Sequence, residues 1–346
     1  MDMKKRFVLL SLLATLSLSG CDSFSNIFSI KSKDDDSTTQ NNEEKSSEQS
    51  SLITFTQEDD ETTEEDTTQT TTINVSGDDA DLINAYYQNI NITSADSGSP
   101  LKVKLYNLIK GHTKYNYGSL EVAMKVTDRD YELDPITSNE SDNYDPYMKL
   151  LYADYNGDKS TAKKWSTSQG SFGTETNYVW NKEHIWAKSN GFGNASSCEA
   201  YSDLHHLRAS DWKCNNRRGN NPFGVISNHS TSNASEDYTQ SRKTDNYYTT
   251  TLFEPRDADK GDVARALFYM ATRYYNGDGS NGSNLTLTTG TDSSGGKWGY
   301  LNTLLQWHVQ DPPDAFEIHR NSLVQSFQKN RNPYIDHPEW AQKVFG

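Results

Sequence analysis

The sequence predicts a mostly helical α+β domain that carries a small, irregular β element in its middle. Three observations lead to this prediction. Apolar residues recur at three- and four-residue steps in several segments on both sides of the centre. Residues 128–176 are polar and rich in Tyr, Ser and Gly, which is typical of loops with short strands. Two short runs that follow, 178–180 and 204–209, have the composition of strands.

The helical spacing is strongest in residues 260–274. There Val263, Leu267 and Met270 fall on one face, and Asp262 lies in the first turn, where the helix dipole favours an anion. Residues 277–297 are rich in Gly, Ser, Thr and Asn and are expected to form a loop. Further helices are expected at 82–90, 101–109, 116–124 (entered through a loop), 301–308 and 314–328.

The N-terminal residues resemble a bacterial export signal. Lys4, Lys5 and Arg6 give a positive start, and residues 7–18 form an apolar run too short to span a bilayer comfortably. The run ends in Leu-Ser-Gly-Cys21, which resembles the bacterial lipobox and implies cleavage before Cys21 and lipidation of its thiol. We therefore expect a signal peptide at 1–20; the alternative is an ordinary signal peptide followed by an incidental cysteine.

An acidic segment separates this signal from the domain. Residues 22–79 carry 16 acidic and 3 basic side chains, so most of the net charge of −15 belongs here, and only −4 remains for residues 80–346. The segment has few apolar residues and is expected to be disordered and extended. We therefore expect a tether at 21–80 and a single domain at 81–346. The overall acidity neither excludes nor supports a nucleic-acid substrate.

Two cysteines lie inside the domain, at Cys198 and Cys214. Outside the cytoplasm such cysteines tend to pair, and closing a loop of about sixteen residues contributes roughly 3 kcal/mol. A disulfide between them is expected; the alternative is two thiols.

The residues suited to catalysis are concentrated in 181–186 and 203–224. His184 can take a proton from water near neutral pH. Glu183 and Asn215 offer hard oxygen atoms of the kind that Mg²⁺ prefers. Arginines bind phosphate oxygens bidentately, and the candidates are Arg208, Arg217 and Arg218. Together these residues indicate hydrolysis of a phosphodiester.

The local structure expected around them is strand, strand and short helix. If the first strand continues through Glu183 and His184, their side chains point to opposite faces. Ser210 or Asp211 is expected to cap a short helix that ends at Gly219.

These segments resemble the ββα-metal nucleases of the endonuclease I type, and the resemblance covers roughly residues 100–346. The matching text is Asn181-Lys-Glu-His-Ile-Trp, Asp203-Leu-His-His-Leu-Arg-Ala-Ser-Asp, Lys213-Cys-Asn-Asn-Arg-Arg-Gly-Asn, Asn221-Pro-Phe-Gly, Lys260-Gly-Asp-Val-Ala-Arg-Ala-Leu-Phe-Tyr-Met and Asn330-Arg-Asn-Pro-Tyr-Ile-Asp-His-Pro. Lys182 stands where Arg is expected, and Ala209 where Pro is usual.

The resemblance implies that His184 is the general base and that Glu183 and Asn215 bind the metal, Mg²⁺ or alternatively Mn²⁺ or Ca²⁺. It also implies that Asp203 and His205 support the β element rather than bind metal. The implied protein is a monomer that cuts DNA and also RNA, with weak sequence preference, and leaves 5′-phosphate and 3′-hydroxyl ends.

Two other functions are alternatives to a nuclease. A zinc peptidase would need His-Glu-x-x-His or its inverted form, and neither spacing occurs in the sequence. A surface lipoprotein that binds carbohydrate or protein without catalysis fits the 20 Tyr and 7 Trp residues. That alternative predicts a degenerate centre, whereas the three central positions are occupied by competent residues.

Overall fold

A computed structural model describes residues 78–135, 146–154, 180–192, 198–229, 245–278 and 283–346 in full, and the backbone of 28–32, 51–57, 69–74 and 233–234. It is an α+β fold, as predicted. The helices are α1 (Asp79–Tyr87), α2 (Gly98–Ile109), α3 (Leu120–Thr127), α4 (Trp212–Arg218), α5 (Lys260–Arg273), α6 (Leu301–Gln310), α7 (Ala315–Gln328), α8 (Pro333–Asp336) and α9 (Glu339–Phe345), with 3₁₀ turns η3 (Glu199–Ser202), η4 (Asp257–Asp259) and η5 (Tyr275–Gly277).

The strands form four small sheets. They are β1 (Phe28–Ser32), β2 (Ser51–Gln57), β3 (Gln69–Asn74), β4 (Trp180–His184), β5 (Leu207–Asp211), β6 (Asn233–Ala234), β7 (Tyr247–Tyr248), β8 (Phe253–Glu254), β9 (Thr286–Leu287) and β10 (Lys297–Trp298). Three of the sheets, β1–β2–β3, β4–β5 and β6–β7–β8, are antiparallel, whereas β9 and β10 pair in parallel.

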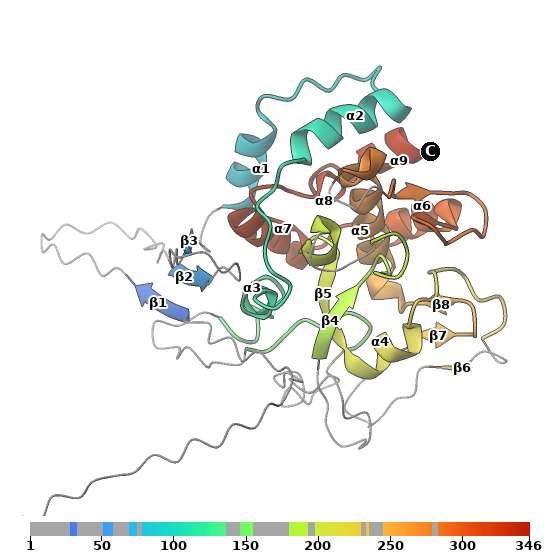
Figure 1. Ribbon diagram of the computed structural model, residues 1–346, viewed down its shortest axis with the longest axis horizontal. Coiled ribbons are helices and arrows are strands. Elements are labelled where there is room, and N and C mark those ends of the chain that lie inside the picture. The colour runs from blue at the N-terminus through green and yellow to red at the C-terminus, as the bar shows by residue number, and fades with distance from the viewer. Residues whose placement is uncertain are drawn as a thin grey trace, which may run out of the picture.

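Helix α5 lies in the middle of the body, with the β4–β5 pair beside it, α7 and α3 on one side and α6 on the other (Figure 1). The sequence predicts an amphipathic helix here, but every residue of α5 except Asp262 is buried. Burial of its charged residues is tolerated because each is paired: Arg265 with Glu317, Arg273 with Glu199 and Lys260 with Glu254.

The strand, strand and short helix predicted around Glu183 are present. Strand β4 pairs antiparallel with β5, and Glu183 lies opposite Arg208. Helix α4 follows β5 directly. It is Asp211, not Ser210, that caps α4, since its side chain accepts a hydrogen bond from the backbone N of Cys214 at 2.9 Å. The helix ends at Gly219, whose φ of 55° lies in the left-handed region that glycine tolerates. Tyr178 lies outside the described residues.

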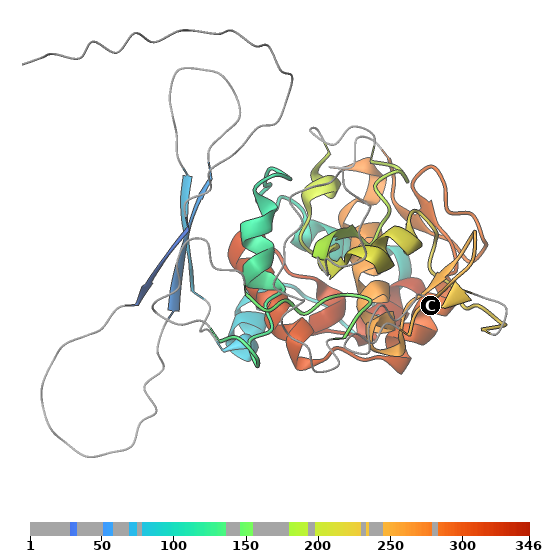
Figure 2. The same ribbon diagram turned by 90° about the horizontal axis from the view of Figure 1, so that it is seen from below.

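The N-terminal region differs from the prediction at three places. The expected tether contains strands β1, β2 and β3, which pair into an antiparallel sheet to one side of the helical body (Figure 2). Alternating Thr, Ile and Phe residues favour strands even where the surrounding composition is acidic. The expected signal at 1–20 and Cys21 lie outside the described residues. Within the described part of the chain, no helix has the length and apolarity needed to cross a membrane.

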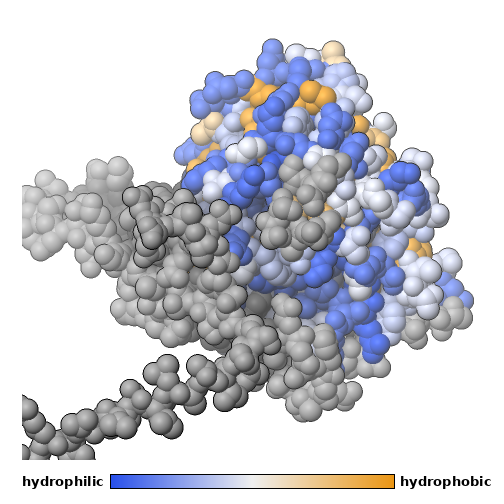
Figure 3. Space-filling view, in the orientation of Figure 1, coloured by the Kyte–Doolittle hydropathy of each residue, from blue (hydrophilic) through white to orange (hydrophobic). Residues whose placement is uncertain are grey.

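The C-terminal region adds elements that the sequence did not predict. The expected loop at 277–297 contains β9 and the start of β10. Helices α8 and α9 follow α7, and the turn between α7 and α8 is buried. There Arg331 forms an ion pair with Asp336 at 2.7 Å, and Asn332 caps α8. The space-filling view in Figure 3 shows a mainly hydrophilic face on which apolar residues form only small separate groups.

A buried ion network joins the β4–β5 pair to the helices. Arg208 on β5 donates to Asp128, at the end of α3, at 3.1 Å, and to Asp262 on α5 at 3.0 Å. Arg320 on α7 donates to the second oxygen of Asp128, also at 3.0 Å. The guanidinium of Arg208 is 5% exposed and Asp128 is fully buried. Four elements are therefore connected through two arginines and two carboxylates.

Replacing Arg208 with Met should lower the free energy of unfolding by about 3 kcal/mol, because buried Asp128 and half-buried Asp262 would each lose one of their two cationic partners and keep only Arg320 and Arg265. Urea denaturation measures the change. The control is Lys297→Met, which breaks an exposed pair with Asp292 and should cost no more than about 0.5 kcal/mol. Equal stability of Arg208→Met and the natural protein would contradict the role given to this network.

Candidate active site

Glu183 lies near the end of β4 with its carboxylate buried at 2% exposure. Its Oε1 accepts a hydrogen bond from the hydroxyl of Tyr152 at 2.8 Å, and Nη1 of Arg218 lies 3.5 Å from the same atom. Burial raises the pKa of Glu183, while Arg218 and the Tyr152 hydrogen bond oppose that rise. These contacts engage Oε1, and the backbone N–H of His184 is a further hydrogen-bond donor to the carboxylate.

Asn215 lies on α4, one turn after its cap, and its side chain turns toward β4. Its Nδ2 donates to Oδ1 of Asn181 at 2.9 Å and to the carbonyl of Lys182 at 3.5 Å. Both amide hydrogens are thus directed at the strand, so Oδ1 is the atom left for a ligand. Because Asn181 and Glu183 are two residues apart on one strand, they share a face. The side chain of Asn215 therefore contacts the face of β4 that carries Glu183.

His184 is the last residue of β4 and points to the opposite face from Glu183, as predicted. Its ring stacks on Tyr117 with centroids 5.5 Å apart and meets the edge of Tyr201 at 4.7 Å. Its Nε2 lies 2.9 Å from the carbonyl oxygen of Tyr201. A carbonyl only accepts, so Nε2 carries the hydrogen and Nδ1 has the lone pair. Burial holds the pKa of His184 well below its ordinary value, and the neighbouring His206 adds to the effect.

The three predicted phosphate-binding arginines lie in different surroundings. Arg208 belongs to the buried ion network described above, in which its guanidinium donates to Asp128 and Asp262. Arg218 is also buried, and donates to the backbone carbonyls of His184 at 3.0 Å and Ile185 at 2.6 Å. It holds the end of β4 in place. Arg217 alone among the three is exposed, with its guanidinium over the ring of Tyr248.

Asp203 and His205, for which a supporting role is predicted, are both buried and hydrogen-bonded. Asp203 is fully buried and accepts hydrogen bonds from Tyr269 and Tyr274, both at 2.8 Å, and from Gln328 at 3.0 Å. Burial alone would raise the pKa of Asp203, but the nearby histidines and the Gln328 hydrogen bond lower it. His205 bonds Asn330 through Nε2 at 3.2 Å. The segment before β5 is thereby fastened to α5 and to the end of α7.

The predicted disulfide is not formed in this structure, in which Cys198 and Cys214 are both buried thiols. Each has its own surroundings. The Sγ of Cys214 accepts a hydrogen bond from Asn246 at 3.6 Å. Cys198 directly precedes η3, and burial raises the pKa of its thiol.

Several residues that the sequence did not single out complete the site. Tyr152 contacts Glu183, Asn181 orients Asn215, and Tyr117 with Tyr201 encloses His184. Asn181 lies two residues before Glu183 in the motif, so strand alternation could have predicted that both side chains lie on one face. Tyr152 had no such signal, because it comes from a loop 31 residues earlier.

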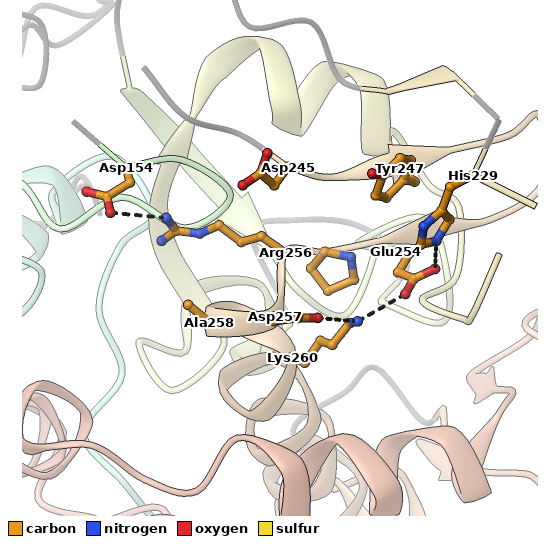
Figure 4. A pocket seen from close by; sticks show the side chains of 10 residues that line it. Asp154, His229, Asp245, Tyr247, Glu254, Arg256, Asp257, Ala258 and Lys260 are labelled. Atoms are coloured by element: carbon orange, nitrogen blue, oxygen red, sulfur yellow. Dashed lines mark hydrogen bonds and ion pairs between the residues drawn. The ribbon is translucent and has the colours of Figure 1, made fainter. Parts of the chain in front are cut away.

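A cavity of about 450 Å³ lies beside η4, lined by residues that include His229, Tyr247, Arg256 and Lys260 (Figure 4). None of the predicted site residues lines it. Its cations are engaged by carboxylates, Lys260 with Glu254 at 3.0 Å and Arg256 with Asp259 at 2.6 Å. We therefore place the candidate centre at β4 and α4 rather than in this cavity.

The donor set at β4 and α4 suits a hard divalent cation. One carboxylate and one amide oxygen, with water completing the shell, is the mode in which Mg²⁺ is commonly held. Among the described residues, no group of three or more His, Cys, Asp and Glu side chains could hold a metal.

Comparison with known proteins places this arrangement in a family. Residues 97–339 match the family described as Endonuclease I. The chain is 41% identical over 262 residues to an extracellular ribonuclease of Bacillus amyloliquefaciens, which covers 75% of this chain and 78% of that protein. It is 37% identical over 264 residues to an extracellular ribonuclease of Bacillus subtilis (strain 168), which covers 76% and 78%.

The buried histidines predict how stability depends on pH. Burial lowers the pKa of both His205 and His206 from 6.5 to about 4. The folded state therefore keeps both rings neutral where the unfolded state would protonate them. Their contribution to the free energy of unfolding is complete above pH 6.5. It is lost as the pH falls toward 4, by up to about 3 kcal/mol for each histidine. Thermal unfolding between pH 7 and pH 4 measures this loss.

The matched variant is His206→Asn, whose side chain does not titrate. It should show a smaller decrease in Tm over the same pH range than the natural protein, whatever its Tm at pH 7. If both proteins lose stability in parallel, the protonation of His206 does not contribute.

Proposed function

This chain belongs to the endonuclease I family and is a nuclease that hydrolyses nucleic acid, and from this premise we propose that its reaction takes place at Glu183, Asn215 and His184. The observation that carries the proposal is the paired orientation of the two oxygen ligands. Both hydrogen bonds of Asn215 to β4 use its amide nitrogen, which supports Oδ1 as a ligand together with the carboxylate of Glu183, two residues from Asn181 on the same strand. Mg²⁺ is the proposed cation, with Mn²⁺ or Ca²⁺ as alternatives.

His184 is proposed as the general base. Because its Nε2 donates to the carbonyl of Tyr201, Nδ1 accepts the proton from the attacking water. The stacked ring of Tyr117 and the edge of Tyr201 hold the imidazole in one orientation. A bound divalent cation supplies electrostatic stabilisation of the phosphate charge that develops during the reaction.

The water attacks phosphorus in line, and the 3′ oxygen leaves. The products therefore carry 5′-phosphate and 3′-hydroxyl ends. No step uses a 2′-hydroxyl, so DNA and RNA are both proposed substrates, and the names of the two Bacillus relatives support RNA. Arg217, exposed at the end of α4, is the proposed phosphate contact. Binding through phosphates implies weak sequence preference and an affinity that falls with salt.

The proposed site of action is outside the cell. The two relatives are called extracellular, and the N-terminal residues have the features of an export signal. We propose in addition that Cys21 carries a lipid, that residues 21–80 connect this anchor to the nuclease domain, and that the protein acts as a monomer.

The chain without residues 1–21 should degrade plasmid DNA in the presence of Mg²⁺ or Mn²⁺ and stop on addition of EDTA. His184→Ala should lower the rate by at least about two orders of magnitude, because the water would lack its base. A gel assay of plasmid and of a uniform RNA measures both activities. Lys297→Ala is the control, since its exposed amine pairs with Asp292 at the surface, and it should cut at close to the natural rate.

Two outcomes would overturn these assignments. Cleavage by His184→Ala at the natural rate would remove His184 as the base. DNA binding without cleavage under every metal tested would favour the alternative of a surface binding protein. Glu183→Gln and Asn215→Ala should instead raise the metal concentration needed for half-maximal rate.

Replacing Cys21 with Ser should move the protein from the membrane fraction to the culture medium when the full chain is expressed in a bacterium that lipidates exported proteins. Immunoblotting of the two fractions measures the change, and nuclease activity should follow the protein. A natural chain found wholly in the medium, like the Cys21→Ser variant, would contradict lipidation at this position.

A further inference from the structure

Tyr152 has an unusual backbone conformation. Its φ is 71°, in the left-handed region that large aromatic residues rarely adopt. The residue is also completely buried. Such a conformation persists only where the surrounding contacts require it, and it is concentrated at functional sites.

Contacts from three directions hold Tyr152 in this conformation. Its backbone N donates to Oδ2 of Asp259 at 2.7 Å, and its carbonyl accepts from Nδ2 of Asn246 at 2.8 Å. The preceding residue, Leu151, pairs with β5: its N donates to Ala209, and its carbonyl accepts from Asp211. The ring of Tyr152 packs against Phe253, with centroids 5.0 Å apart. These contacts leave the side chain one direction in which to extend.

That direction leads to Glu183. The hydroxyl of Tyr152 donates to Oε1 of Glu183 at 2.8 Å. The Nη1 atom of Arg218, on α4, lies 3.5 Å from the same oxygen. A buried carboxylate that accepts a hydrogen bond at one oxygen, with a guanidinium 3.5 Å from the same oxygen, has little rotational freedom. Its second oxygen is then presented in a fixed direction, on the face of β4 that also carries Asn215. An unheld carboxylate would lose rotational entropy each time that it bound a cation.

We propose that Tyr152 is a positioning residue, whose hydroxyl orients the carboxylate of Glu183 for binding a divalent cation. The inference rests on the proposed function of Glu183 as a metal ligand. It assigns Tyr152 no contact with the substrate and no part in proton transfer. Its strained backbone is explained by this role, because a relaxed φ would turn the hydroxyl away from Oε1.

The test is Tyr152→Phe, which removes only the hydroxyl. Binding of Mn²⁺ alone to the chain without residues 1–21, followed by electron paramagnetic resonance, should show a Kd raised about tenfold. In the plasmid assay the half-saturating Mg²⁺ concentration should rise by a similar factor. Saturating metal should restore most of the rate, because the base and the ligands are intact. Glu183→Gln should raise the Mn²⁺ Kd by more than Tyr152→Phe does, and so show that the assay reports this site.

Tyr274→Phe is the matched control. It too removes a buried hydroxyl that donates to a buried carboxylate at 2.8 Å, but that carboxylate is Asp203, outside the proposed metal site. It should lower Tm while leaving the Mn²⁺ Kd unchanged. A second variant, Asn246→Ala, keeps the hydroxyl of Tyr152 and removes one backbone anchor, and it should also raise the Mn²⁺ Kd.

The proposal is overturned if Tyr152→Phe binds Mn²⁺ as tightly as the natural protein, or if Tyr274→Phe raises the Kd equally. It is also overturned if excess metal restores no activity to Tyr152→Phe. Failure of the proposed function would give a different result. In that case the natural protein and Glu183→Gln would bind Mn²⁺ with the same Kd.

Discussion

The structure depends on one buried pair, Arg208 with Asp128. Through it the β4–β5 pair is joined to α3, and through Asp262 and Arg320 to α5 and α7. The geometry at Glu183 is set by this connection, because β5 determines where β4 lies and where α4 begins. Buried charges are costly unless they are fully paired. Here the pairing fixes the position of a two-stranded sheet that is too small to be stable alone.

Local sequence signals predicted the elements of the site well. Strand-like runs at 178–180 and 204–209, a cap at Ser210 or Asp211 and a terminal Gly indicated strand, strand and helix. The structure contains them in that order, with the strands shifted to 180–184 and 207–211. The opposite orientation of Glu183 and His184 also followed from alternation. Helix α5 was placed correctly, but its complete burial was not expected, because its charged partners Glu317 and Glu199 lie far away in the sequence.

The remaining differences arise from contacts between distant segments. A motif arginine such as Arg208 has the same local sequence whether it faces phosphate or a buried carboxylate, and only Asp128 and Asp262 decide which. The same holds for Tyr152, whose role depends on Asn246 and Asp259 holding an uncommon φ. The β strands of residues 28–74 were missed because acidic composition outweighed short runs of Thr and Ile in the prediction.

The contacts of Asp203 with Gln328 and of His205 with Asn330 have a consequence for folding. Each joins residues that lie 125 positions apart in the sequence. The segment before β5 therefore takes up its position only when a distant part of the chain has packed against it, and contacts of this kind slow the search for the native state. The order at the candidate site is thus a property of the whole domain and not of the short motif that contains Glu183 and His184.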